Sequence, residues 1–308
     1  MPQNVIGVDI AKDWIDTFCL DSGAARRLGT DPKSLKAFAR QCAGALVVFE
    51  ASGGYERPLA EALAKAGVAY ARVNPRQARE FARATGRLAK TDRVDAGVLA
   101  RMGRALELAP TPPPDPARVR LAALVARRDD LVEEAAREAV RLKQARDGFV
   151  RADIASLIRL LKARIIRFER EIAGLIAAEP PLAQTERRLR TAPGIGPLTA
   201  ASLIARLPEL GHVSRSAIAN LAGLAPHACD SGQMRGQRHI WGGRKEVRKS
   251  LYQAAFIASR YDPALKALRK RLQDAGKPFK VAIIAVARVL LTQINAILRE
   301  QRNYIPGR

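Results

Sequence analysis

Four acidic residues stand where their carboxylates can converge, and they are Asp9, Glu50, Asp92 and Asp95. Asp9 interrupts a run of Val, Ile and Gly, where an ionised carboxylate is costly unless a positive charge lies opposite it. Asp92 and Asp95 are three residues apart, so both point to one face of a helix. Hard oxygen ligands select Mg²⁺ or Mn²⁺ over zinc. These residues therefore predict a site for Mg²⁺, which Mn²⁺ can replace.

A carboxylate set of this kind suits phosphodiester chemistry. Two divalent ions about 4 Å apart activate a water or hydroxyl and stabilise the leaving oxygen when a strand is cut. Each residue alone has a plainer interpretation: Asp92 caps a helix, Asp95 is solvated, and Asp9 is a turn residue. We favour the metal interpretation because the four residues occur together in a strongly basic chain.

The charge balance points to a polyanionic partner. The 308 residues include 53 Lys and Arg against 30 Asp and Glu, for a net charge of +23. Such a field attracts nucleic-acid backbones and makes binding depend on salt. The longest apolar run near the C-terminus, 281–291, contains Arg288 and is shorter than the roughly 20 residues that span a bilayer, so no membrane partner is expected.

The N-terminal segment does not match a secretory signal, which predicts a cytoplasmic protein. Together with the expected polyanionic partner, this predicts association with the nucleoid. Asp9 and Lys12 interrupt the only apolar stretch of this segment. The cysteines are three in number and widely spaced, which favours reduced thiols over a disulfide framework; they are Cys19, Cys42 and Cys229.

The hydrophobic pattern places these residues on particular elements. A short β-branched run predicts a strand over 4–10, and 14–20 alternates as its hairpin partner. A further buried strand over 45–49 ends at Glu50. The remaining expected elements are helices over 32–42, 56–66 and 91–106, a helix after Pro75, and a strand over 68–73. Strands that first form a meander and then alternate with helices indicate an α/β domain with a mixed sheet.

Proline and heptad patterns divide the chain into three predicted regions. Five prolines between 110 and 116 end the α/β domain, which covers 1–110. Leu and Ile then recur at close to heptad spacing in two long helices that meet near Gly148 and form a coiled-coil region over 111–182. The rest, 183–308, is expected to be a helical domain.

The glycines of the segment 193–197 predict a helix-hairpin-helix-like element. Gly194 and Gly196 would let the following helix present its N-terminal amides to a phosphate. The plain alternative is an ordinary tight turn between helices.

A serine follows within a basic, glycine-rich stretch. Guanidinium groups around Ser231 would favour its alkoxide and a phosphorane-like transition state, although an isolated Asp-Ser-Gly is more often a turn. His227 and His239 lack the paired ligands of a zinc site, so we reject zinc there. The residues expected to hold nucleic-acid backbones are Arg235, Arg238, Arg244, Lys245, Arg248 and Lys249.

Several motifs resemble those of one family. Residues 7–12, 50–55 and 90–96 resemble the successive DEDD motifs of insertion-sequence transposases with a RuvC-like N-terminal domain. Residues 193–196, 222–226 and Ser231-Gly232 resemble the second, transposase domain of that family. One departure is Gly242-Gly243, where many relatives have Gly-Asn before an arginine of the final basic helix. We expect this departure to change local DNA contacts and to leave the chemistry unchanged.

The resemblance implies a fold and a mechanism. The fold would be α/β plus all-α: a ribonuclease H/RuvC-like domain, a coiled-coil region and a helical C-terminal domain. Family members are recombinases guided by a structured bridge RNA that pairs with donor and target DNA, and they work as multimers, so a dimer or tetramer is expected. By motif, the metal-binding tetrad falls on Asp9, Glu50, Asp92 and Asp95. The nucleophile falls on Ser231, which would form a phosphoserine with DNA at a site shared between subunits.

Two other functions remain open on the sequence alone. One is a hydrolytic junction nuclease, in which a metal-activated water cuts and Ser231 is a turn residue. The other is an architectural RNA- or DNA-binding protein, in which the acidic residues only support the fold.

Overall fold

The computed structural model describes residues 4–86, 92–112, 115–227 and 238–306, and for 92–94 and His227 it describes the backbone only. The chain divides into two compact units, Met1–Pro113 and Pro114–Arg308. Each unit is described by itself.

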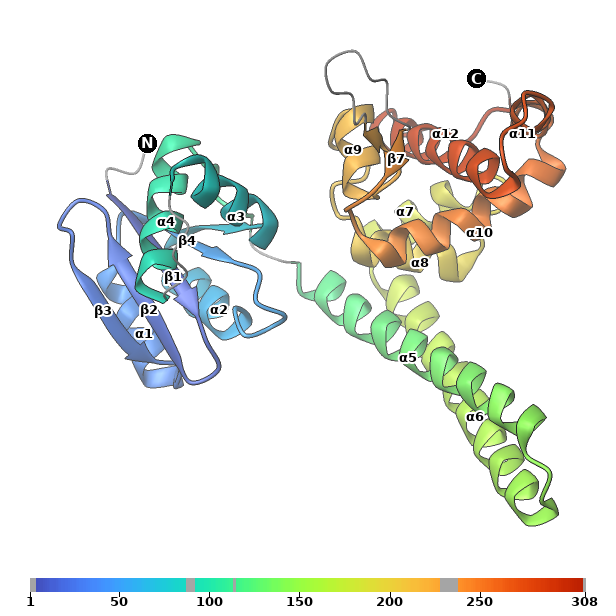
Figure 1. The fold of residues 1–308 in the computed structure, drawn as a ribbon, viewed down its shortest axis with the longest axis horizontal. Coiled ribbons are helices and arrows are strands. Elements are labelled where there is room, and N and C mark those ends of the chain that lie inside the picture. The colour runs from blue at the N-terminus through green and yellow to red at the C-terminus, as the bar shows by residue number, and fades with distance from the viewer. Residues whose placement is uncertain (1–3, 87–91, 113–114, 228–237, 307–308) are drawn as a thin grey trace. The chain divides into compact units, whose positions relative to one another are not determined.

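The first unit is built on a mixed sheet with the strand order β3-β2-β1-β4-β5 (Figure 1). Its strands are β1 (Asn4–Ile10), β2 (Trp14–Cys19), β3 (Ala25–Gly29), β4 (Ala45–Glu50) and β5 (Ala69–Val73). The first three are antiparallel neighbours, whereas β4 and β5 run parallel to β1. The carboxyl ends of β1, β4 and β5 therefore lie at one edge of the sheet.

Helices cover both faces of this sheet (Figure 1). Helices α1 (Pro32–Gln41) and α2 (Arg57–Lys65) pack on one face, against a core that includes Val8, Ile15 and Phe49. Helix α4 (Asp92–Ala105) lies on the other face, and α3 (Pro75–Ala84) also contributes to the core there. Helices α1 and α3 each begin with a proline that follows a side-chain cap, Asp31 and Asn74, and this local pattern marks where the two helices begin.

Helix α4 crosses β1 at unusually short range, and two glycines allow it. A Cβ atom on Gly7 would lie 1.9 Å from the carbonyl oxygen of Ala96 and 2.5 Å from the amide nitrogen of Ala100. A Cβ atom on Gly103, seven residues later in α4, would lie 2.9 Å from a methyl group of Val5. Since Ala96 lies over Gly7 and Gly103 over Val5, α4 runs antiparallel to β1. Its first turn therefore lies near the carboxyl ends of β1 and β4.

The second unit is helical apart from a short ribbon (Figure 1). Its elements are α5 (Pro116–Gln144), α6 (Gly148–Ala178), α7 (Pro180–Leu189), α8 (Pro197–Arg206), α9 (Arg215–Leu221), β6 (Pro226–His227), β7 (His239–Ile240), α10 (Lys245–Tyr261), α11 (Pro263–Asp274) and α12 (Phe279–Arg299). Helices α5 and α6 form a long hairpin. Leu121 and Val125 of α5, together with Ile172 and Ile176 of α6, belong to the same core as α8, α10 and α12.

Helix α12 supplies the most deeply buried side chains of this core. Ile283, Leu290 and Ile294 are fully buried. The helix is long and apolar enough to cross a membrane by length and composition, but half of its apolar window is buried within this unit. Its one buried amide, Asn295, accepts a hydrogen bond from the N–H of Gly211 at 2.8 Å and donates one to the carbonyl of Val213 at 3.0 Å. The helix thus fixes the 207–213 segment through both groups of that amide.

The expected order of an α/β part with a mixed sheet followed by a helical part is confirmed. Two strand pairs were not predicted. Strand β3 has the sequence ARRLG, whose two arginines and exposed side chains resemble a loop more than a strand. Ribbon β6–β7 has only two residues in each strand, too few for a pattern. Cys19 and Cys42 are free thiols, as expected, and burial raises the pKa of Cys42 to about 12; Cys229 lies outside the described residues.

The close approach of α4 to β1 predicts the effect of a single methyl group. Gly7→Ala should lower the free energy of unfolding by about 3 kcal/mol, because its Cβ meets backbone atoms that cannot rotate away. Gly97→Ala in α4 is the control: its Cβ would come within 3 Å only of the flexible end of Arg101, and the ring of Phe18 lies at an ordinary contact distance of 3.8 Å. Urea unfolding followed by circular dichroism measures both, and equal stabilities would contradict the proposed packing.

Candidate active site

Asp9 and Glu50 lie side by side at the carboxyl ends of neighbouring parallel strands. The register of β1 and β4 pairs Val8 with Phe49, and each acidic residue comes next on its strand. Neighbouring strands are about 4.8 Å apart. Both side chains are half-buried, and Oδ1 of Asp9 accepts a hydrogen bond from the N–H of Ile10 at 3.0 Å.

Both side chains belong to the sheet face that α4 covers. Side chains alternate along a strand, so Asp9 shares a face with Val5 and Gly7, and Glu50 with Val48. Val5 and Val48 pack with Leu99 and Met102 of α4 in the core of that face. The sequence thus places two acidic residues beneath the same helix.

The other two predicted carboxylates belong to the first turn of α4. Asp92 begins the helix, although its side chain lies outside the described residues, and half-buried Asp95 immediately precedes Ala96 over Gly7. Because α4 runs antiparallel to β1, this turn lies near the strand ends that carry Asp9 and Glu50. The fold therefore brings all four predicted positions to one region of one face.

The donor chemistry of these positions fits a hard divalent cation. Among the side chains that the structure describes, no three from Asp, Glu, His and Cys are gathered closely enough to hold a metal ion. The predicted set includes the side chain of Asp92, which is not among them. The magnesium site therefore stays a prediction, supported by the placement of Asp9 and Glu50.

A buried glutamate that the sequence analysis did not single out shapes the loop after Glu50. Oε2 of Glu56 accepts hydrogen bonds from the N–H groups of Ser52 at 3.1 Å and Gly54 at 2.8 Å. Burial raises the pKa of Glu56, but these hydrogen bonds outweigh it and the pKa is lowered. The ionised Glu56 thus holds the chain in a tight turn directly beyond β4.

A second carboxylate was also missed. Asp16 of β2 is directly opposite Asp9 in the antiparallel ladder and is only 3% exposed. Nε and Nη2 of Arg27 donate hydrogen bonds to its two oxygens at 2.9 Å and 2.7 Å. The Arg27 guanidinium also lies 4.9 Å from the ring centre of Trp14. Alternation along the strand places Asp16 on the same face as Trp14 and Phe18, but this pattern alone does not show that Asp16 is buried.

Ser231 and Arg235 lie outside the described residues, but the structure describes the base of their segment. There, β6 pairs with β7, so that His227 is opposite His239. Beneath this ribbon two glycine turns touch: a Cβ on Gly243 would lie 2.1 Å from the amide nitrogen of Gly223. Both glycines have positive φ, at +63° and +66°, which favours glycine. The departure noted at Gly242-Gly243 therefore lies at a packing contact.

Two of the predicted DNA-binding arginines stabilise that base. Arg244 donates two hydrogen bonds to the carboxylate of Glu209, both at 2.6 Å, and one to the carbonyl of Arg206. Arg248 donates to the carbonyl oxygens of Gly223 and Gly242, at 3.3 Å and 2.8 Å. Both side chains thus fix the turns from which the serine segment leaves.

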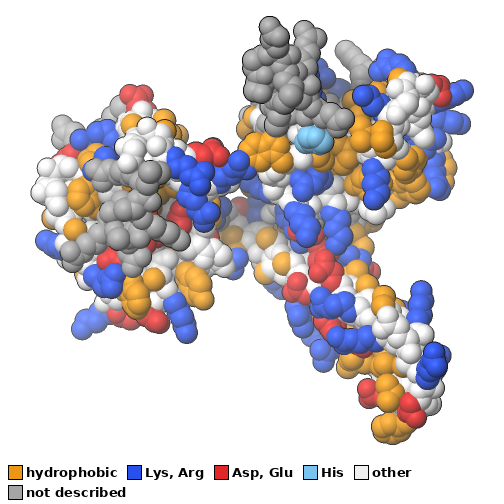
Figure 2. All heavy atoms as spheres, viewed as in Figure 1, with side chains coloured by type: hydrophobic (Ala, Val, Ile, Leu, Met, Phe, Trp, Pro, Cys, Tyr) orange, Lys and Arg blue, Asp and Glu red, His pale blue; other side chains and the backbone are white. Residues whose placement is uncertain are grey.

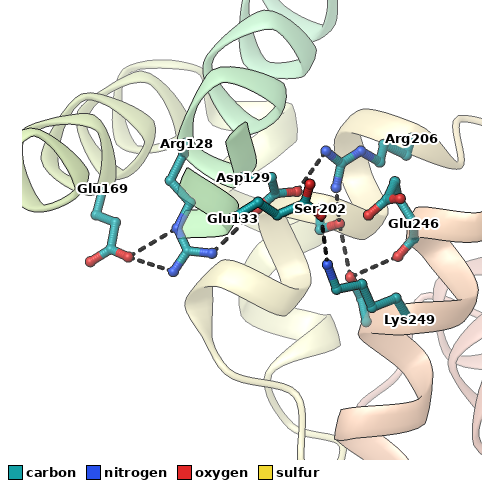
Figure 3. A network of polar contacts seen from close by, with 9 residues as sticks. Arg128, Asp129, Glu133, Glu169, Ser202, Arg206, Glu246 and Lys249 are labelled. Atoms are coloured by element: carbon teal, nitrogen blue, oxygen red, sulfur yellow. Dashed lines mark hydrogen bonds and ion pairs between the residues drawn. The ribbon is translucent and has the colours of Figure 1, made fainter. Parts of the chain in front are cut away.

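Lys249 belongs to a polar network that joins α5, α6, α8 and α10 (Figure 3). Its Nζ lies 3.1 Å from a carboxylate oxygen of Glu133. Arg206 donates to Asp129 at 2.7 Å and to the Ser202 hydroxyl at 2.9 Å. The neighbouring Arg128 donates to Glu169 at 2.7 Å. The network attaches the base of the α5–α6 hairpin to the helices that carry the basic residues.

The remaining predicted contacts differ in exposure. Arg238 and Lys245 are exposed and, in the part of the chain that the structure describes, make no ion pair. Gly194 packs against α10, where a Cβ would lie 2.2 Å from the carbonyl oxygen of Ala254, whereas Gly196 at the start of α8 has open space around it. Figure 2 shows Lys and Arg side chains over the visible face, with acidic side chains interspersed along the hairpin.

Comparison with known proteins identifies the chain's relatives. A family model described as a transposase, of the IS110 DEDD type, matches residues 6–150, and one described as the transposase family of IS116, IS110 and IS902 matches 186–270. The chain is 30% identical over 320 residues to the pilin gene-inverting protein of Moraxella bovis, covering 99% of this chain and 98% of that protein.

Two further relatives are similar. The pilin gene-inverting protein of Moraxella lacunata is also 30% identical over 320 residues, with the same coverage. An uncharacterized 43.6 kDa protein of insertion element IS110 from Streptomyces coelicolor is 29% identical over 138 residues, covering 44% of this chain and 33% of that protein. The first family model covers the α/β unit and the start of the α5–α6 hairpin, and the second covers helices that follow the hairpin. The chain belongs to the IS110 family of DEDD transposases.

Proposed function

We propose that this transposase cuts and exchanges DNA strands through a Mg²⁺ site on the α/β unit and a serine of the helical unit. One observation carries the proposal: Asp9 and Glu50 end adjacent parallel strands beneath α4, whose first turn holds Asp92 and Asp95. Relatives named for inverting a pilin gene support strand exchange, since inversion requires cutting and rejoining.

The first step of the proposed mechanism belongs to the carboxylates. Asp9, Glu50, Asp92 and Asp95 would hold Mg²⁺ in a ribonuclease H-like, RuvC-like domain. When bound, the ion neutralises the scissile phosphate and the leaving oxygen. The tight turn held by Glu56 fixes the chain beyond Glu50, which limits how far that carboxylate can move.

The second step belongs to Ser231. Its hydroxyl loses a proton and its oxygen attacks phosphorus; a serine–phosphorus bond forms as the strand's phosphorus–oxygen bond breaks, and the leaving oxygen takes a proton. Arg244 and Arg248 would act by fixing the base of this segment, because their described contacts are to the protein itself. The carboxylates and the serine belong to different compact units of the chain. That they act together at a site shared between subunits is proposed from the resemblance to the family.

The proposed partners are donor and target DNA, a structured guide RNA and a second copy of the chain. Within the predicted set of backbone contacts, Arg238 and Lys245 are exposed and make no ion pair in the described part of the chain, so we propose that they contact a phosphate backbone. Self-association as a dimer or tetramer is supported by exposed apolar side chains on the α5–α6 hairpin, which are Val119, Val140, Phe149, Val150, Leu157, Leu160 and Ile166.

A metal-dependent junction nuclease that acts by hydrolysis shares the carboxylate site and differs at the serine. Ser231→Ala should abolish strand cleavage and the covalent protein–DNA adduct, because the attacking oxygen is removed. Denaturing electrophoresis of the protein with labelled element-end DNA detects the adduct. Ser156→Ala, at an exposed helical position of α6, should behave as the wild type. Intact cleavage without an adduct would establish the hydrolytic mechanism instead.

The carboxylates give a second prediction. Asp9→Asn and Glu50→Gln should each lower the cleavage rate by about a hundredfold or more, since metal stabilisation of the transition state is worth several kcal/mol. Asp13→Asn, an exposed turn position between β1 and β2, removes the same charge and should leave the rate unchanged. Wild-type rates for Asp9→Asn in a strand-cleavage assay would favour a purely architectural role.

The exposed cations give a third. Replacing Arg238 and Lys245 together by Gln should weaken DNA binding and reduce the slope of log K against log salt by about two, as two phosphate contacts are lost. Lys33→Gln with Lys36→Gln is the matched control, with the same charge change on exposed positions of α1. Filter binding at several salt concentrations measures the slopes, and equal slopes for the two double variants would rule out specific contacts.

A further inference from the structure

A row of four charged side chains crosses the sheet beneath α4. Arg27 of β3 is paired in register with Asp16 of β2, and Asp16 with Asp9 of β1. Glu50 of β4 is the next position beyond the Val8–Phe49 pair, beside Asp9. Residues opposite each other on neighbouring strands point to the same face, with Cβ atoms about 4.5–5.5 Å apart. The row therefore consists of the cation Arg27 followed by three acidic residues, Asp16, Asp9 and Glu50. Asp9 and Glu50 are proposed metal ligands.

The Asp16–Arg27 pair is built to hold a charge at a fixed place. The Asp16 side chain is 5% exposed, and both of its oxygens accept hydrogen bonds from Arg27. The Arg27 side chain is 52% exposed and lies against the Trp14 ring. Removing a carboxylate from water costs free energy, and replacing a buried ion pair by two apolar side chains often leaves a protein equally stable. Stability alone therefore does not explain a buried carboxylate beside Asp9.

We propose that Asp16 and Arg27 are positioning residues that set the affinity of the metal site, an inference that rests on the proposed function. The pair is a dipole whose negative end is one strand from Asp9 and whose positive end is two strands away. The nearer carboxylate attracts a cation at Asp9, and the guanidinium moderates that attraction. Because Arg27 occupies both oxygens of Asp16, this carboxylate contributes its field without becoming a ligand.

This arrangement predicts opposite effects from its two halves. Asp16→Asn leaves an uncompensated cation near the site and should weaken Mn²⁺ binding by about tenfold, whereas Arg27→Gln leaves an uncompensated anion and should tighten it by a similar factor. The double variant should bind with nearly wild-type affinity. Arg27→Lys keeps the charge and should also bind nearly as the wild type does, even where its looser geometry lowers stability.

The measurement is titration of the full-length protein with Mn²⁺ alone, followed by electron paramagnetic resonance of the free ion. Arg26→Gln is the matched control: Arg26 is exposed, pairs with Thr17 and therefore points to the opposite face of the sheet. Thermal unfolding of every variant identifies those that remain folded at the titration temperature. If Arg27→Gln does not fold, Asp16→Asn compared with Arg27→Lys still tests the sign of the effect.

The outcomes separate this inference from the proposed function. Opposite shifts for Asp16→Asn and Arg27→Gln, with no shift for Arg26→Gln, support the pair as a positioning device. Shifts in one direction, or a shift for Arg26→Gln as large as that for Arg27→Gln, would overturn it while the metal site stands. Wild-type Mn²⁺ affinity in Asp9→Asn would instead overturn the metal site on which the inference rests.

Discussion

The close contact between α4 and β1 at Gly7 is the constraint on which the candidate site depends. A side chain at this position would collide with the backbone of Ala96 and Ala100. Without the contact, the first turn of α4 would lie farther from the strand ends, and Asp95 could not share a region with Asp9 and Glu50. Cores are close-packed, so even one added methyl group is felt. A residue with no side chain thus determines how near the first turn of α4 comes to the strand ends that carry Asp9 and Glu50.

Positive charge in this protein serves the fold as well as its partners. The net charge of +23 predicts a polyanionic partner, but it does not show which cations meet it. Arg244, Arg248 and Lys249 all lie in the basic stretch, and each has a partner within the helical unit. Their contacts fix the glycine turns at Gly223 and Gly242 and the base of the α5–α6 hairpin. Basic residues near a site can therefore affect activity without touching nucleic acid.

The sequence predicts the N-terminal part well because its signals are local. Val, Ile and Gly around Asp9 identify both a buried strand and a carboxylate that needs a partner, and Glu50 follows from the apolar run that it ends. Asp16 was missed because a polar residue in an alternating strand is usually solvent-facing, and only the register with Asp9 shows that it is buried. Likewise, β3 was not predicted as a strand because it contains two arginines. The structure shows that Arg27 can lie in the sheet because it donates hydrogen bonds to Asp16 on the neighbouring strand.

The contacts of two glycines also could not be predicted from the sequence. The sequence predicted Gly194 as part of a phosphate-binding hairpin and marked Gly242-Gly243 as a departure from the family pattern. In the structure, Gly194 and Gly243 each meet backbone from a distant part of the chain. Sequence spacing cannot reveal such tertiary contacts, because the atoms that exclude a side chain come from elsewhere. The assignment of Ser231 as the nucleophile rests on resemblance to the family and not on the local sequence pattern.

We propose that carboxylates on two strand ends and one helix turn form a single divalent-metal site, and anomalous diffraction from crystals of the full-length protein grown with Mn²⁺ would locate the ion. We expect an anomalous peak about 2.1 Å from carboxylate oxygens of both Asp9 and Glu50, on the face covered by α4. An ordered α/β unit in which Mn²⁺ binds elsewhere, or in which Asp9 and Glu50 contact only protein and water, would contradict it.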